Sequence, residues 1–567
     1  MRVRGWVLDG VLGVLAAVTV VVSAWQLEAG RAGLAMRDIA VGATPVTVVH
    51  RADLDAPAPV VVIAHGFAGA RQLMQPFAFA LARAGYVAVS FDFIAHGAHP
   101  ESLPAEIEGV GGAADRLIDQ LAAVSEAARA LPESDGRHAL LGHSMATDLI
   151  ARAMAAAGPR PEAVVALSLF SPEVTAVSPP NMLVVTGGWE VGLTAEALRV
   201  LNLTANALAR PDEAIPANAR MVAEAGAAAE ARRRVAEGDG SGFRDGPAIL
   251  KPLAGEGDSV GAMAEGTARR VVFAEGVEHI GVLFDPEGQV AAIDWLDRAF
   301  GVAREGPVEP DVRGPWIGLL FAGLLLGARP LSRLMPRLAV PPAGAGARWG
   351  WLIAIAAVPA VLAPMIVVAF PSRVMPIVLG DYLAKHFFVQ GVLTGLALWL
   401  AARRGLVAWP DFRVAGRPAL WLAAGAVGGW VLLVFALTLH RHAFPFVPTP
   451  DRALIIPVLA LALIPWFLAD EWLTRAAPGG TGTGARALAY AATKVVFVLS
   501  LALAVFLDTE RLFFLMIVAP VILVFFLVYG CISQWAMRAT GHPFVAAGGI
   551  ALALAWSIAV SFPLFAL

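Results

Sequence analysis

The feature that most constrains the fold is a series of long apolar segments that begins at Trp316 and continues to the end of the chain. A segment of about 20 apolar residues matches the thickness of a lipid bilayer, because an α-helix rises about 1.5 Å per residue. We predict eight spans, near residues 315–332, 350–370, 383–402, 419–440, 453–470, 487–507, 512–535 and 544–565. Residues 314–567 are therefore predicted to form an all-α transmembrane domain.

The N-terminus carries one more apolar segment. Basic residues in Met1–Arg4 precede Trp6–Trp25, a stretch interrupted by Asp9 and a few small residues. This pattern is typical of a signal peptide or of an uncleaved anchor. Because the bulky Trp25 makes a poor cleavage site, we predict that residues 1–28 are a transmembrane signal anchor, and a cleaved signal peptide is the alternative. The anchor would bring the number of spans to nine.

Composition supports a membrane protein. The chain has 567 residues, of which 58% are hydrophobic and 15% are charged, and no soluble domain of this length has that balance. Its net charge of −3 argues against a nucleic-acid partner. The single cysteine, Cys531, can form no internal disulfide. Abundant Ala, Arg and Gly with few Lys indicate a bacterial source.

Arginines are distributed unequally between alternate loops of the predicted spans. One set of loops carries Arg329, Arg333, Arg337, Arg348, Arg403, Arg404, Arg413, Arg417, Arg475, Arg486 and Arg538. The other set carries Arg373, Lys385, Arg441, Arg452 and Arg511. Since cytoplasmic loops are enriched in Lys and Arg, we predict a multi-pass inner-membrane protein with residues 30–305 on the extracytoplasmic side.

Residues 30–305 have a different character, because short β-rich runs alternate with Ala-rich helical stretches such as Arg71–Ala84 and Ala113–Leu131. The predicted strands are Thr44–His50, Pro59–Ala64, Val87–Phe91, His138–Leu141, Ala163–Leu169, Met182–Thr186 and Arg270–Ala274. This alternation predicts an α/β domain with a parallel sheet.

One strand of this domain leads into a short motif with chemical meaning. In Ala139–Ala146 an apolar strand runs into Gly142-His143-Ser144, and a helix-favouring stretch follows. A sharp turn between a strand and a helix exposes a serine above the sheet, and it needs small neighbouring residues. The sequence therefore predicts a nucleophilic serine at Ser144.

Acyl transfer from a serine also needs a base, an acid that orients the base, and N–H donors for the oxyanion. In the fold that carries such a turn, the acid and then the histidine follow the serine along the chain. Glu190 follows the strand Met182–Thr186, and His279 follows Arg270–Ala274, so we predict Glu190 as the acid and His279 as the base. Glu278 is the alternative acid, although it adjoins the histidine.

The oxyanion donors are predicted from two backbone positions. One is the N–H of Met145, which follows the serine. The other is the N–H of Phe67 in the loop His65-Gly66-Phe67, where glycine allows the main chain to turn.

Together these pieces resemble the α/β-hydrolase fold superfamily, in its lipase, esterase and serine-aminopeptidase-like branch. The matching motifs, in order over nearly all of residues 44–300, are His65-Gly66-Phe67, Asp92…His96-Gly97, Gly142-His143-Ser144-Met145-Ala146, Gly187…Glu190 and His279. The resemblance implies a Ser144–His279–Glu190 triad with no cofactor and no metal. Ala146 in place of glycine and Glu190 in place of the commoner aspartate depart from the usual pattern.

The interval between Glu190 and His279 is long for this superfamily. Residues 195–265 combine an Ala-rich helical stretch with a glycine-rich segment. We predict that they form a lid over the site or a contact to the membrane domain.

A second motif lies in the membrane half. Asp470-Glu471 and Arg475 resemble the Glu-Glu-x-x-x-Arg motif of CAAX-protease-like intramembrane metalloenzymes. Those enzymes need histidine ligands on later spans, and the only later histidine is His542. We therefore interpret the motif as a salt-bridged cap at the membrane interface.

The sequence predicts a membrane-anchored, extracytoplasmic serine hydrolase that cleaves an ester, thioester or amide. Its expected partners are a small-molecule or lipid-like acyl substrate and membrane lipids, and transfer of the acyl group to an acceptor other than water would use the same residues. The alternative is a transporter or channel in which a non-catalytic α/β-hydrolase-like domain binds ligands or regulates, since fold alone does not fix function.

Overall fold

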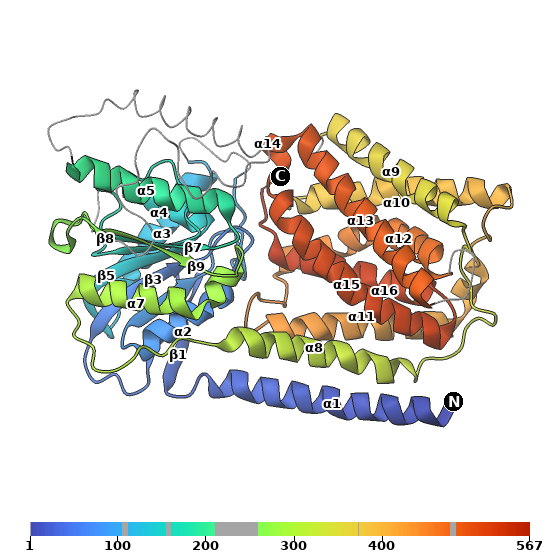
Figure 1. Ribbon diagram of the computed structural model, residues 1–567, viewed down its shortest axis with the longest axis horizontal. Helices are drawn as coiled ribbons and strands as arrows, with labels where there is room; N and C mark the ends of the chain where they lie inside the picture. The colour runs from blue at the N-terminus through green and yellow to red at the C-terminus, as the bar shows by residue number, and fades with distance from the viewer. Residues whose placement is uncertain are drawn as a thin grey trace. The chain divides into compact units, whose positions relative to one another are not determined.

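The computed structural model describes residues 2–104, 111–154, 160–209, 259–371, 373–476 and 483–566. The chain divides into two compact units. One unit is Leu27–Pro315, and the other combines Met1–Gln26 with Trp316–Leu567. The unit Leu27–Pro315 contains the sheet, and the other is helical (Figure 1).

The sheet has the strand order β1-β2-β4-β3-β5-β6-β7-β9-β8. Its strands are β1 (Leu34–Val41), β2 (Thr44–Arg51), β3 (Ala58–Ala64), β4 (Val87–Phe91), β5 (Ser134–His143), β6 (Val164–Leu167), β7 (Met182–Gly187), β8 (Ser259–Val260) and β9 (Arg269–Ala274). The strands from β4 through β9 in this order pair in parallel, whereas β1, β2 and β8 pair antiparallel at the two sides. The sheet is therefore mixed and predominantly parallel.

Helices cover both faces of the sheet. In Figure 1, α3 (Ala113–Arg129), α4 (Met145–Ala153) and α5 (Val191–Ala209) lie on one face, and α2 (Gln75–Arg83) and α7 (Pro286–Phe300) lie on the other. Because both faces are covered, the central strands are continuous apolar runs, and all seven residues of β3 are buried. The fold class is α/β, as predicted.

Each of the seven predicted strands falls on an observed strand. Two strands were not predicted. β1 alternates half-buried and exposed residues, including the charged Arg37 and Asp38, and β8 has only two residues. The helix predicted over Arg71–Ala84 starts as a 3₁₀ turn, Arg71–Met74. Of the lid predicted at 195–265, residues 195–209 lie in α5, and residues 210–258 lie outside the described residues.

A buried carboxylate joins the loops that follow β3 and β4. Asp92, with no exposed surface, accepts hydrogen bonds from the backbone N–H groups of Arg71 (2.8 Å) and Ala98 (2.9 Å), and it pairs with the Arg71 guanidinium. His65 also joins these two loops, because its Nε2 accepts a hydrogen bond from the backbone N–H of Phe93 at 3.1 Å. These contacts fix the His65–Ala70 loop above the sheet.

We predict that Asp92→Ala destabilises the α/β unit by about 3–5 kcal/mol, because it leaves the Arg71 guanidinium and two backbone donors without their buried acceptor. Hydrogen exchange of peptides from β3 and β4 measures the effect. Asp53→Ala is the control, because it removes an exposed ion pair with Arg51 in the same unit. Equal protection of β3 in both variants would contradict the prediction.

In the part of the chain that the structure describes, nine helices are long and apolar enough to cross a membrane. They are α1 (Arg2–Ala29), α8 (Arg313–Ser332), α9 (Trp349–Ala369), α10 (Gly380–Arg403), α11 (Pro418–Leu439), α12 (Pro450–Arg475), α13 (Thr483–Leu507), α15 (Leu515–Thr540) and α16 (Phe544–Ser561). Each predicted span falls on one of them. These lengths and compositions are consistent with a membrane protein.

The helical unit is held together by small residues and by buried ion pairs. A Cβ added to Gly428 of α11 would lie 2.9 Å from the Cα of Gly549 of α16, so the two backbones meet. On α12, Glu471 binds Arg475 through two hydrogen bonds of 2.9 and 2.8 Å. Asp470 instead pairs with Lys494 of α13. The motif is salt-bridged, as interpreted from the sequence, but all four side chains are buried among neighbouring helices.

Candidate active site

Ser144 lies at a strained turn between β5 and α4. Its backbone dihedral angles are φ 52° and ψ −116°, a region that residues other than glycine rarely occupy. A Cβ added to Gly142 would lie 2.6 Å from Ile150 Cδ1 and 3.1 Å from the carbonyl carbon of Ala146, so glycine allows the strand and the helix to approach closely there. Ala146 is fully buried, and its methyl group is accommodated where the usual motif has a second glycine.

The loops after β5, β7 and β9 bring three side chains into one hydrogen-bonded chain. His279 Nε2 lies 2.9 Å from Ser144 Oγ, and its Nδ1 lies 2.5 Å from Glu190 Oε1. Since an ionised carboxylate only accepts, this arrangement fits a proton on Nδ1 and leaves Nε2 to accept from the serine. The predicted triad residues are therefore within hydrogen-bonding distance, and their catalytic roles stay a prediction.

Two donors hold the Glu190 carboxylate from its other side. Its Oε2 accepts the backbone N–H of Gly187 and the hydroxyl of Ser168, each at 2.7 Å. Ser168 follows β6, has a positive φ of 53° and is fully buried. Sequence reasoning missed this residue because it lies inside the predicted strand Ala163–Leu169, where it is the one polar side chain of an otherwise apolar run.

Glu278, the alternative acid, does not approach the imidazole in this arrangement. Its carboxylate accepts the backbone N–H groups of Ile280 at 2.7 Å and Gly281 at 3.0 Å. It thereby caps the turn on which His279 is carried. The geometry favours Glu190 as the partner of the histidine.

The two predicted oxyanion donors lie on segments that meet at Ser144. Met145 is the first residue of α4, where a backbone N–H has no acceptor within the helix. Phe67 belongs to the loop after β3, and this loop touches the turn: a Cβ added to Gly66 would lie 3.0 Å from Ser144 Cβ and 2.8 Å from His143 Nδ1. A substrate carbonyl bound at Ser144 would be next to both segments.

His143, the residue before the serine, supports the histidine loop. Its Nε2–H donates to the backbone carbonyl of His279 at 2.9 Å, and the two rings are 4.8 Å apart. Burial, together with the nearby His279, lowers the pKa of His143 to about 3. His143 is therefore neutral near pH 7, and it places no positive charge beside the base.

The edge of the sheet near Ser144 also presents apolar side chains. Phe170, after β6, is 65% exposed, and Trp189, after β7, is 69% exposed. Large exposed aromatic residues at one edge indicate a surface for an apolar group. Within the described residues, no cluster of His, Cys, Asp and Glu could hold a metal ion.

Comparison with known families gives one matching family model. Residues 55–222 match the model of the Hydrolase_4 family, described as serine aminopeptidase, S33. The unit Leu27–Pro315 has the α/β-hydrolase fold. The matched segment is less than half of the chain and includes Ser144 and Glu190 but not His279. The match supports a hydrolase at a general level.

Solved structures give more distant likenesses. An epoxide hydrolase from an endophytic Streptomyces is 20% identical (TM-score 0.20) over 25% of this chain and 39% of its own. A thioesterase domain from the curacin biosynthetic pathway is also 20% identical (TM-score 0.20), over 24% and 44%. The matched part of this chain thus spans about two fifths of the length of these two proteins. A lipase in its open form is 17% identical (TM-score 0.26) over 47% and 99%. None of the curated proteins compared matches the chain.

We predict that acid destabilises the α/β unit through His143. Its folded pKa of about 3 lies below the ordinary histidine value of 6.5, so between these values the unfolded chain takes up a proton that the folded chain does not. The resulting stability is complete above pH 6.5 and decreases as the pH falls toward 3, by about 1.4 kcal/mol per pH unit.

Hydrogen exchange of β5 peptides between pH 7 and 4.5, corrected for the intrinsic exchange rate, measures this effect. His143→Gln keeps a side-chain N–H donor but removes the titration, so its protection should depend less on pH than that of the wild type. Peptides from α16 in the same samples are the control. An unchanged pH dependence in the variant would contradict the prediction.

Proposed function

We propose that this protein is a membrane-anchored serine hydrolase that cleaves an ester, thioester or amide through an acyl-enzyme. The observation that carries the proposal is the hydrogen-bonded chain from Ser144 through His279 to Glu190. The family match of residues 55–222 adds support, because it assigns that segment to a family of hydrolases.

In the first half-reaction, the Ser144 oxygen attacks the substrate carbonyl, and its proton passes to His279 Nε2. The carbonyl π electrons move to its oxygen, and the N–H groups of Phe67 and Met145 stabilise that negative charge. Glu190 accepts a hydrogen bond from Nδ1–H and stabilises the imidazolium. Because His143 is neutral, its ring adds no positive charge that would oppose formation of this imidazolium.

The bond to the leaving group then breaks, His279 returns the proton to that group, and the acyl-enzyme is formed. In the second half-reaction, water gives a proton to His279 and attacks the acyl carbonyl; the bond to Ser144 Oγ breaks, His279 returns the proton to that oxygen, and the acid is released. An alcohol, thiol or amine in place of water would make the same site an acyltransferase. The residues required are identical in both reactions.

We further propose that the acyl group is apolar or lipid-linked and is processed on the extracytoplasmic side. Exposed Phe170 and Trp189 offer apolar contacts next to the turn that carries Ser144. The nine apolar helices among the described residues would keep the site near lipid. The side of the membrane is inferred from the arginine asymmetry of the sequence.

Hydrolysis of p-nitrophenyl esters of increasing acyl length by the purified full chain tests this proposal. Ser144→Ala should reduce the rate to background. Glu190→Gln should reduce kcat by about 10²–10⁴-fold, because the base loses its orienting charge. Glu278→Gln is the matched control, and it should retain activity within about threefold, since this carboxylate only caps a turn.

Two results would contradict the proposal. One is hydrolysis by folded Ser144→Ala at the rate of the wild type. The other is an equal loss in Glu190→Gln and Glu278→Gln, which would remove the distinction between the two carboxylates. Circular dichroism of each variant verifies the fold.

The substrate class is tested separately by the double variant Phe170→Ser with Trp189→Ser, which should lower the rate for long-chain esters more than for the acetate.

A further inference from the structure

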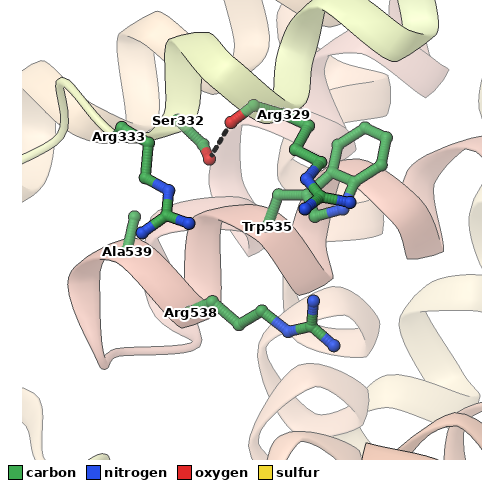
Figure 2. Close-up of a pocket in the computed structure, with 6 residues that line it drawn as sticks. All are labelled: Arg329, Ser332, Arg333, Trp535, Arg538 and Ala539. Carbon is green, nitrogen blue, oxygen red and sulfur yellow. Dashed lines mark hydrogen bonds between the residues drawn. The ribbon is translucent and has the colours of Figure 1, made fainter. Parts of the chain in front are cut away.

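A cavity of about 140 Å³ lies between one end of α8 and the C-terminal part of α15 (Figure 2). Its volume is roughly ten times the ~10–15 Å³ that one water molecule requires. The residues that line it are Arg329, Ser332, Arg333, Trp535, Arg538 and Ala539. The volume is large enough for a small polar group. Three of the six lining residues are arginines, so the cavity is also strongly basic.

One acidic side chain offsets part of this charge. Asp9 of α1, which is buried, lies 3.0 Å from Arg329 Nε and 2.7 Å from an Nη atom of Arg333. No carboxylate pairs with the Arg538 guanidinium within the residues that the structure describes. Asp9 thus supplies one negative charge against three positive charges, and the lining retains an excess of positive charge.

Other contacts hold the walls of the cavity in place. The Arg337 guanidinium donates to the carbonyls of Arg538 at 2.7 Å and Ala539 at 3.1 Å, which fixes the segment after α8 against the end of α15. Ser332 is buried and donates to the carbonyl of Arg329 at 2.7 Å. The arginines are therefore carried by a fixed backbone rather than by an isolated loop.

We propose that this cavity binds an anionic phosphate-bearing group. A guanidinium presents paired N–H donors that match the oxygens of a phosphate, and several arginines around one space can bind it together. A basic pocket between membrane helices suits the headgroup of an acidic lipid, and the half-buried Trp535 suits the interfacial depth of such a headgroup. Arginine enrichment of loops alone would not gather three side chains around one cavity.

The same chemistry fits an acidic phospholipid or a soluble phosphate ester. Native mass spectrometry of the full chain in detergent separates them. The probes are dioleoyl phosphatidylglycerol, dioleoyl phosphatidylcholine, dioleoylglycerol and sn-glycerol 3-phosphate. Dioleoylglycerol lacks a phosphate, and dioleoyl phosphatidylcholine has a phosphate but no net charge. We expect phosphatidylglycerol to be retained more strongly than both.

The matched variants change charge at the exposed arginines of the cavity. Arg333→Gln with Arg538→Gln should weaken retention of phosphatidylglycerol by about tenfold or more, since each basic residue near an anionic group contributes about 1 kcal/mol. The corresponding double Lys variant keeps both charges and should retain most of the binding. Arg413→Gln is the control, because Arg413 is an exposed arginine of the same unit outside the cavity.

Retention of phosphatidylglycerol without binding of glycerol phosphate would identify a lipid headgroup as the ligand. Comparable binding of glycerol phosphate, lost in the double Gln variant, would identify a soluble phosphate ester. Equal retention of phosphatidylglycerol and dioleoylglycerol, or an unchanged affinity in the folded double Gln variant, would overturn the proposal. A melting temperature in detergent verifies that each variant is folded.

Discussion

The candidate site depends on the parallel register of β5, β6, β7 and β9. Gly142 is opposite Ala166, Leu167 is opposite Val185, and Gly187 is opposite Ala274. The carboxyl ends of these four strands therefore lie side by side, and the loops that follow them carry Ser144, Ser168, Glu190 and His279. Residues separated by up to 135 positions in the sequence meet because the sheet sets the distance between their loops. The strained backbone of Ser144 is tolerated because the elements on its two sides are held in place: β5 is paired within the sheet, and α4 has a buried face.

Buried polar groups are organised differently in the two units. Around Glu190, each carboxylate oxygen has a partner, and the buried Asp92 accepts from both backbone and side chain. In the helical unit, ionisable side chains such as Glu471 with Arg475 pair within and between helices. In lipid an unpaired charge has no water to solvate it, so such pairing is expected there. The cavity lined by Arg329, Arg333 and Arg538 departs from this pattern, because its positive charges exceed the single carboxylate of Asp9.

Much of the α/β fold could be predicted from sequence because buried parallel strands are continuous apolar runs bounded by turns. The positions of Ser144, Glu190 and His279 followed from their places after three such strands. Ser168 was missed, and the contact of His143 with the His279 loop could not be specified, because both depend on contacts between residues at or after the ends of different strands. β1 was missed because only the pairing with β2 makes its half-exposed residues a strand. The basic cavity could not be predicted, since its lining combines the end of α8 with residues of α15 about 200 positions later in the sequence.

The most direct measurement is the mass of the peptide that contains Ser144 after the membrane-embedded protein reacts with a fluorophosphonate. An activated serine displaces fluoride and forms a stable phosphonate ester, whereas an ordinary surface serine does not react at a comparable rate. The account predicts one adduct, on Ser144, whose formation is slowed in His279→Ala. A folded wild-type protein that forms no adduct on Ser144, or that forms it equally fast in His279→Ala, would contradict the account.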